Sequence, residues 1–302
     1  MPPKNKKEYA RCFGQDLMRG EHTVGENLTW VKGNRAGKLD EVSGKILAAQ
    51  TQSGTSIFDP VLCELAYRWF SPVGGLILDP FAGGSVRGIV AAKLGRKYTG
   101  IDVRAEQVEA NRDQARELTP DAPPTWVLGD SRDVASLSPG AYDFIFSCPP
   151  YGDLEVYSDE PGDISTLGHE AFIEAYRAII AASIGLLVDD RFACFVVGDY
   201  RDKKGFYRNF VSETISAFEA AGAKLYNEAI LVTALGSLPI RAGKSFSSGR
   251  KLGKTHQNVL VFVKGDWKQA SKACGEVDVT LPDFDVNDGD YGSTRREVEE
   301  AA

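Results

Sequence analysis

Long apolar runs and paired cysteines are both missing from this chain of 302 residues. No stretch reaches the roughly 20 apolar residues that span a bilayer, and the opening MPPKNKKEYARCFG has no signal-peptide core. The five cysteines form no C-x-x-C pair, which argues against a disulfide framework or a structural zinc site. We therefore expect a cytoplasmic protein with reduced thiols, no membrane association and no bound metal.

Acidic residues are absent from one long segment and concentrated in another. Residues 276–302 contain nine Asp or Glu and two Arg, and so account for the whole net charge of −7. Residues 229–265 contain no acid but six Lys or Arg. The body of the protein is therefore close to neutral and can present a local basic surface to a polyanion.

Short β-rich runs alternate with helical patterns from residue 76 onward. This alternation predicts βαβ units and a mostly parallel sheet of seven strands, so the fold class is α/β. A helix is predicted to start at Asp59 and Pro60, before the first strand, and another to run from about Phe206 to Ala221, after the fifth. The last two strands, near 224–234 and 258–265, are expected to pair as an antiparallel hairpin with a long loop at 234–257. We divide the chain into an irregular extension (1–50), one domain (51–268) and an acidic, disordered tail (269–302).

A glycine loop follows the first predicted strand in LILDPFAGGSVRG. Gly83 and Gly84 allow a ligand to approach the backbone, and the helix that follows supplies free N–H groups. The loop has neither the lysine of a phosphate-binding loop nor a G-x-G-x-x-G turn. Asp79 at its start would repel a pyrophosphate and favours a cationic ligand.

Further acids follow the next two predicted strands. Asp102 ends the second strand and is suited to accept the hydroxyls of a ribose. Asp130 and Ser131 end the third strand, where an acid can accept from an adenine amino group. Each acid alone could be a simple helix cap, but together they predict a nucleoside with a positive centre, which is S-adenosylmethionine.

The fourth predicted strand, YDFIFSCPPYG, ends in two prolines and a tyrosine. Prolines cannot donate to a sheet ladder, so they form a rigid rim beyond the strand. A proline-rich partner motif is the alternative interpretation, but such motifs lie in disordered segments and not after a buried strand.

These two motifs together resemble those of S-adenosylmethionine-dependent DNA amino-methyltransferases. DPFAGGS is similar to their D-P-F-x-G-x-G cofactor loop, and SCPPYG to their [DNS]-P-P-[YFW] catalytic motif. The likeness to phage-type modification methylases implies a Rossmann-like methyltransferase fold, methylation of adenine N6 or cytosine N4 in double-stranded DNA with a flipped-out base, and a place in DNA modification. It leaves a homodimer and a cognate nuclease open.

The resemblance also implies roles for residues at matching positions. The expected cofactor contacts are Ser56, Phe58, Asp79, Phe81, Ala82, Gly83, Asp102, Asp130 and Ser131. The expected catalytic residues are Cys148, Pro149, Pro150 and Tyr151, with the proline carbonyl accepting from the amino group and the tyrosine ring stacking on the base.

Cys148 departs from the family pattern, which has Asp, Asn or Ser before the prolines. A thiol is a poor acceptor, so the choice between adenine and cytosine stays open. A carbon-5 cytosine methyltransferase would use a cysteine as its nucleophile, but in the order Pro-Cys.

The acid-free segment predicts the DNA contacts. Basic residues among small polar ones suit phosphates, and we name Arg241, Lys244, Arg250, Lys251 and Lys254. The stretch GDYRDKKG after the fifth strand is also expected to face the active site, through Asp199 and Arg201. RNA guanine-amino methylation, DNA binding without catalysis, and small-molecule methylation are the alternative functions.

Overall fold

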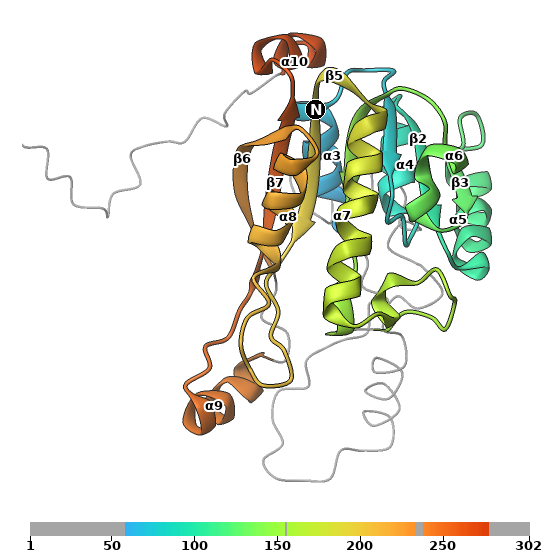
Figure 1. The fold of residues 1–302 in the computed structure, drawn as a ribbon. Coiled ribbons are helices and arrows are strands. Elements are labelled where there is room, and N and C mark those ends of the chain that lie inside the picture. Colours follow the sequence, from blue (N-terminus) through green and yellow to red (C-terminus); the bar gives the residue numbers. More distant parts are fainter. Residues whose placement is uncertain (1–57, 155, 234–237, 278–302) are drawn as a thin grey trace, which may run out of the picture.

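The computed structural model describes residues 58–277 apart from residue 155 and residues 234–237 (Figure 1). Seven strands within these residues form one sheet in the order β3-β2-β1-β4-β5-β7-β6. The first five run parallel, and β7 pairs antiparallel with β5 and β6. The predicted α/β fold with an antiparallel terminal hairpin is confirmed. The strands are Leu76–Asp79 (β1), Lys97–Asp102 (β2), Thr125–Leu128 (β3), Tyr142–Ser147 (β4), Leu187–Val197 (β5), Ala223–Val232 (β6) and His256–Lys264 (β7).

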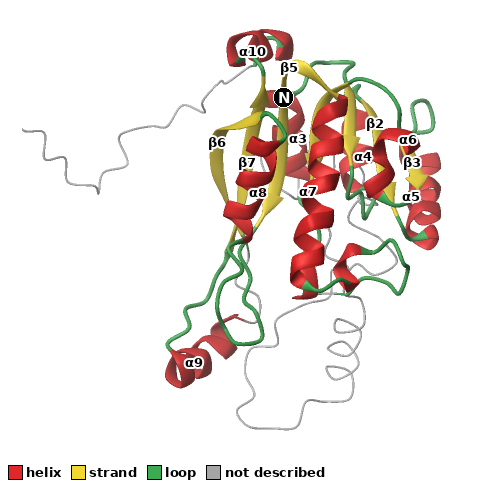
Figure 2. Cartoon of the chain, viewed as in Figure 1, coloured by secondary structure: helices red, strands yellow, loops and turns green. Residues whose placement is uncertain are grey.

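Helices cover both faces of the sheet (Figure 2), which is why the central strands are mostly apolar. The core of one face includes residues of α3 (Pro60–Phe70), α4 (Val86–Lys93), α5 (Ala105–Leu118) and α10 (Trp267–Cys274). The core of the other face includes residues of α6 (Val134–Leu137), α7 (His169–Leu186) and α8 (Phe210–Ala220). None of the helices in the described ranges is long and apolar enough to cross a membrane.

Local sequence signals explain where several elements begin. Asp59 caps α3 by accepting a hydrogen bond from the backbone N–H of Val61 at 2.9 Å, and Pro60 occupies the first turn, as predicted. Gly88 lets α4 lie close to the sheet, because a Cβ there would come within 2.8 Å of the Trp126 ring. The glycine loop before α4 is therefore held near the ends of the strands.

Three predicted boundaries are wrong. The expected loop between the last two strands contains helix α9 (Leu238–Gly249). Its glycines and serines have low helix propensity, so the sequence did not indicate a helix here. Helix α10 occupies residues 267–274, which were assigned in part to the tail; Asp266 caps it, and Ala270 and Cys274 are buried one turn apart. Helix α8 begins at Phe210, four residues later than expected, because a small hairpin precedes it.

Candidate active site

The glycine loop and the proline motif meet where β1 and β4 end. These strands are parallel neighbours, with Leu78 paired to Ile145, so their carboxyl ends lie at the same edge of the sheet. The Ser147 hydroxyl donates to Asp79 Oδ1 at 2.5 Å and accepts from the backbone N–H of Phe81 at 3.2 Å. The two predicted motifs are thus hydrogen-bonded to each other.

Asp79 lies beneath the loop and not at its mouth. Its side chain has no exposed surface, and Oδ2 accepts from Arg87 Nε at 2.5 Å and from the Tyr98 hydroxyl at 2.7 Å. Its negative charge is therefore compensated inside the protein. Direct contact between Asp79 and a cationic ligand stays a prediction.

Arg87 connects Asp79 to the rest of the loop. Its Nη2 donates to the carbonyl oxygens of Phe81 at 2.6 Å and Ala82 at 2.8 Å, and its guanidinium lies 4.7 Å from the centre of the Phe58 ring. Burial alone would lower the pKa of Arg87, but the adjacent Asp79 carboxylate raises it above its ordinary value. Arg87 is therefore charged at any physiological pH and holds the loop in one conformation.

The two loop glycines face open space. A Cβ added to Gly83 or Gly84 would meet no atom within 4 Å, and Gly83 has a left-handed φ of +51°. The backbone N–H of Gly83 donates to Asp102 Oδ2 at 2.9 Å, and its carbonyl accepts from Asn111 Nδ2 at 2.7 Å. The loop therefore has a fixed backbone with room above it for a ligand.

Asp102 stands at the end of β2 beside this open space. Its side chain keeps 11% of its surface exposed, and burial raises the pKa of its carboxyl group. Oδ2 accepts from Gly83 and Oδ1 accepts from the backbone N–H of Arg104 at 2.8 Å. Each carboxylate oxygen can accept a second bond, so Asp102 retains capacity for the hydroxyls of a ribose.

Asp130 and Ser131 follow β3 and have different surroundings. Asp130 forms a salt bridge with Arg132, whose Nε lies 2.8 Å from Oδ2. The Ser131 hydroxyl donates to the carbonyl of Pro80 and so ties the glycine loop to β3. Gly162 lies against Asp130, since a Cβ there would be 3.1 Å from Oδ2. The segment after the proline motif thus folds over the end of β3.

The proline motif presents Cys148 and Tyr151 from opposite sides. Cys148 packs against the core on the α3 side, and burial raises the pKa of its thiol to about 11. The Tyr151 ring lies 6.1 Å from that of Tyr200 and 6.0 Å from that of Phe210. Its hydroxyl accepts a hydrogen bond from Gln257 Nε2, and burial raises its pKa. Tyr151 is therefore firmly held.

Four residues at this edge were missed by sequence reasoning: Arg87, Tyr98, Asn111 and Gln257. Arg87 carried a usable signal, because a cation in the first turn of a helix opposes the helix dipole and needs a buried acid to explain it. The other three lie on distant elements and had no local signal.

The predicted DNA contacts lie on an arm, residues 238–255, which extends beyond the carboxyl edge of the sheet (Figure 1). Lys244, Arg250 and Lys251 are exposed, whereas Lys254 is half-buried and its Nζ lies 3.3 Å from the carbonyl of Asp199. Burial lowers the pKa of Lys254. A Cβ on Gly198 would be 3.4 Å from Lys254 Nζ and 3.8 Å from the Tyr151 hydroxyl oxygen, so the end of the arm lies beside the proline motif. Ser56 and the side chain of Arg241 lie outside the described residues.

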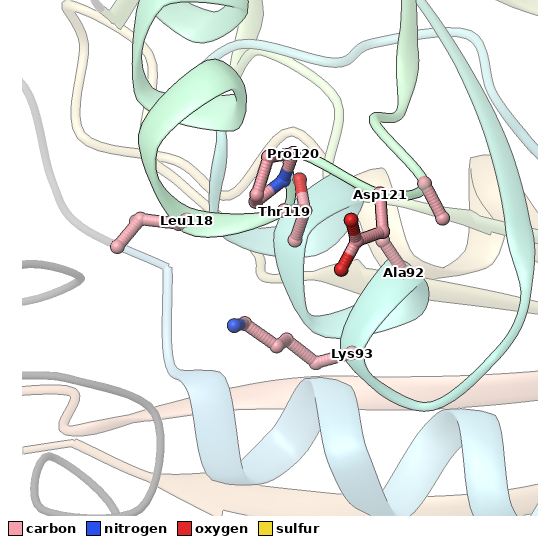
Figure 3. Close-up of a pocket in the computed structure, with 7 residues that line it drawn as sticks. Ala92, Lys93, Leu118, Thr119, Pro120 and Asp121 are labelled. Carbon is pink, nitrogen blue, oxygen red and sulfur yellow. The ribbon is translucent and has the colours of Figure 1, made fainter.

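A pocket of about 240 Å³ lies far from this edge, where α4 and α5 end (Figure 3). Lys93, Thr119 and Asp121 line it. Both helices start at the carboxyl ends of strands and run back, so this pocket is at the opposite edge of the sheet and contains none of the predicted site residues.

Comparison with known proteins supports the segment that contains the glycine loop. The profile of a DNA methylase family matches residues 55–113. A type II methyltransferase, M2.DpnII of Streptococcus pneumoniae, is 30% identical over 111 residues. The resemblance to DNA N6/N4 amino-methyltransferases is confirmed. The matched segment is 36% of this chain and 38% of that relative, so the chain matches less than half of its length.

Solved structures were compared as well. TrmN from Thermus thermophilus matches with a TM-score of 0.48 and 16% identity over 71% of this chain and 52% of its own. A methyltransferase from Pyrococcus furiosus matches with a TM-score of 0.47 and 16% identity over 71% of this chain and 87% of its own.

Proposed function

We propose that this protein transfers a methyl group from S-adenosylmethionine to the exocyclic amino group of adenine or cytosine in DNA. The observation that carries the proposal is the hydrogen-bonded contact between the two motifs, through Ser147 and Asp79. It brings an open glycine loop and a proline-tyrosine motif to one edge of the sheet, where α/β proteins bind ligands.

The residues at this edge fit the proposed cofactor. The open space above Gly83 and Gly84 suits a ligand that contacts backbone, and Asp102 retains acceptor capacity for ribose hydroxyls. Asp130 follows the next strand, β3, and would accept from the base of the nucleoside. When bound, S-adenosylmethionine would supply a methyl group on a positively charged sulfur, which keeps the electrons of the broken carbon–sulfur bond.

The chain's own residues would prepare the acceptor. The lone pair of an aromatic amino group is delocalised into the ring, and a carbonyl that accepts its proton favours a pyramidal, nucleophilic nitrogen. Pro149 would offer such a carbonyl with little reorganisation, because the proline rings fix φ at both positions and Pro150 restricts the backbone of Pro149. Tyr151 would hold the base by stacking. The nitrogen then forms its bond to the methyl carbon and loses a proton to solvent.

The state of Cys148 argues against methylation at carbon 5 of cytosine. That reaction needs a thiolate, whereas a pKa of about 11 keeps Cys148 protonated at neutral pH. An RNA amino group remains the principal alternative acceptor, since it requires the same chemistry. The basic arm supports a polyanionic substrate over a small molecule.

Transfer of labelled methyl to mixed-sequence DNA, followed by mass spectrometry of the nucleosides, tests the proposal. We expect N6-methyladenine or N4-methylcytosine. Asp102→Ala should weaken cofactor binding at least tenfold, whereas Tyr151→Ala should keep cofactor binding and lose turnover. Carbon-5 methylcytosine, or methylation of RNA alone, would refute the proposal. Full activity in both variants would refute the site.

A further inference from the structure

A small charged hairpin, residues 200–208, follows β5 at the edge that carries the candidate active site. Arg201 and Tyr207 form an antiparallel bridge. At the turn, the backbone N–H of Asp202 donates to the Phe206 carbonyl at 2.8 Å, and Asp202 Oδ1 accepts from the Phe206 N–H at 2.9 Å. The backbone of Phe206 is therefore fixed through both of its polar groups.

The side chain of Phe206 contrasts with its fixed backbone. It has 72% of its surface exposed, whereas Tyr207 is 47% exposed and has the Arg201 guanidinium over one face of its ring at 3.9 Å. Single exposed apolar side chains are common on protein surfaces. A ring on a rigid turn is different, because stacking on a flat ligand would cost little backbone entropy.

The charge around Phe206 favours an anionic partner. Lys203 and Lys204 are exposed at the tip of the hairpin. The one acid there, Asp202, accepts hydrogen bonds from backbone N–H groups, first that of Phe206, and these lower the pKa of its carboxyl group. Lys251 of the arm lies against Gly205, since a Cβ there would be 2.6 Å from its Nζ. The hairpin and the arm therefore meet at Lys251, which adds a third lysine near Phe206.

The base of the hairpin packs directly on the proline motif. The Tyr200 ring lies 6.1 Å from the Tyr151 ring, and a Cβ on Gly152 would come within 2.5 Å of the Tyr200 hydroxyl. A nucleotide bound at Tyr151 would therefore have its neighbours along the strand within reach of the hairpin.

We propose that this hairpin is a DNA contact in which Phe206 stacks on a base next to the target and Lys203 and Lys204 bind phosphates. The proposal rests on the proposed function. Rings flanked by cations are the usual means of holding unstacked bases, both in single strands and as wedges in a duplex. The contact is separate from the predicted arm residues and adds base stacking to their phosphate contacts.

Fluorescence anisotropy of the full chain with labelled mixed-sequence DNA, duplex and single-stranded, tests this proposal. Phe206→Ala should reduce affinity about tenfold, and Phe206→Tyr should retain it. Lys203→Ala/Lys204→Ala should reduce the slope of log affinity against log salt by about two. A loss of affinity for single-stranded DNA would indicate that Phe206 is a stacking platform, and a loss of affinity for duplex DNA would indicate that it is a wedge. Both results would support the proposal.

Matched control variants exist at the opposite edge of the sheet. Lys93→Ala/Lys97→Ala removes two exposed lysines there, and Trp267→Ala removes an exposed ring. Neither should change DNA affinity or its salt slope. Thermal unfolding of the Phe206 and lysine variants should match wild type, because the substituted side chains are exposed.

Wild-type affinity in Phe206→Ala together with an unchanged salt slope in Lys203→Ala/Lys204→Ala would overturn the proposal. So would losses seen with structured RNA and not with DNA. Altered DNA binding without any methyl transfer would leave the hairpin contact standing and refute the proposed function. Methyl transfer to DNA together with wild-type DNA affinity in all hairpin variants would support the proposed function and refute the hairpin contact.

Discussion

Replacing Arg87 by methionine should destabilise the protein severely, because it leaves a buried carboxylate without its cation. Asp79 has no exposed surface, and Arg87 Nε is its charged partner at 2.5 Å. Removing one member of a buried ion pair typically costs about 3–5 kcal/mol. The same substitution removes hydrogen bonds to the carbonyls of Phe81 and Ala82, each worth about 1 kcal/mol net.

A double-mutant cycle separates these two contributions. In Asp79→Asn/Arg87→Met the buried charge is gone, so the double variant should recover about 1–3 kcal/mol relative to the sum of the single variants. The carbonyl hydrogen bonds stay lost. The loop should then be less ordered, and cofactor affinity should fall even in the variant that has regained stability.

Urea unfolding followed by circular dichroism gives the free energy of unfolding for each variant. The slope of the free energy of unfolding against urea concentration should be the same in all variants, since the surface exposed on unfolding is unchanged. Arg96→Met is the matched control: Arg96 is also buried, but it donates to the Ser71 hydroxyl and to backbone carbonyls, and none of the acids in the described part of the chain forms a salt bridge with it. Its effect should add to that of Asp79→Asn without coupling.

Two results would refute this reasoning. If Arg87→Met lost less than about 1 kcal/mol, the Asp79 carboxylate would not depend on the arginine. If the double variant were as unstable as the sum of both single variants, the pair would not act as a unit. Unchanged cofactor affinity in the double variant would show that Arg87 does not shape the loop.

Two further predictions follow from the proline motif. Iodoacetamide should modify Cys148 in the folded protein about a hundredfold more slowly at pH 8 than an ordinary cysteine, because its pKa is raised from 9.0 to about 11; an ordinary rate by mass spectrometry would contradict the burial. Gln257→Leu should lower kcat more than it raises KM, because Tyr151 loses the donor to its hydroxyl. The same change in a Tyr151→Phe background should have no further effect, and an additive loss would mean that Gln257 does not act through that hydroxyl.

The strands and their order follow from signals that a sequence displays directly. Alternating apolar runs and helical periods predicted the parallel strands, and two runs without an intervening helical pattern predicted the hairpin. The glycine loop and proline motif could be placed together because parallel neighbours end at one edge. Asp102 was placed beside the loop by the same argument, and Gly83 does bond to it.

The buried ion pair and the irregular segments could not be predicted from these local signals. Asp79 was expected to face a ligand, because its buried partner Arg87 was indicated only by a cation in the first turn of α4. Helix α9 has low intrinsic propensity, so only its spatial context explains it. The hairpin at Phe206 was assigned to a helix because its short bridge lacks any strand period.

The direction of β7 determines which distant residues reach the proposed site. Because β7 runs antiparallel to β5, with Val197 paired to Asn258, it begins at the edge where β5 ends. Its first residues therefore lie beside Tyr151, which Gln257 contacts, and the arm leaves the sheet at the same place. A parallel strand in this position would begin at the opposite edge and direct the basic arm away from the proline motif. The terminal hairpin is thus what brings the acid-free segment of the sequence to the candidate active site.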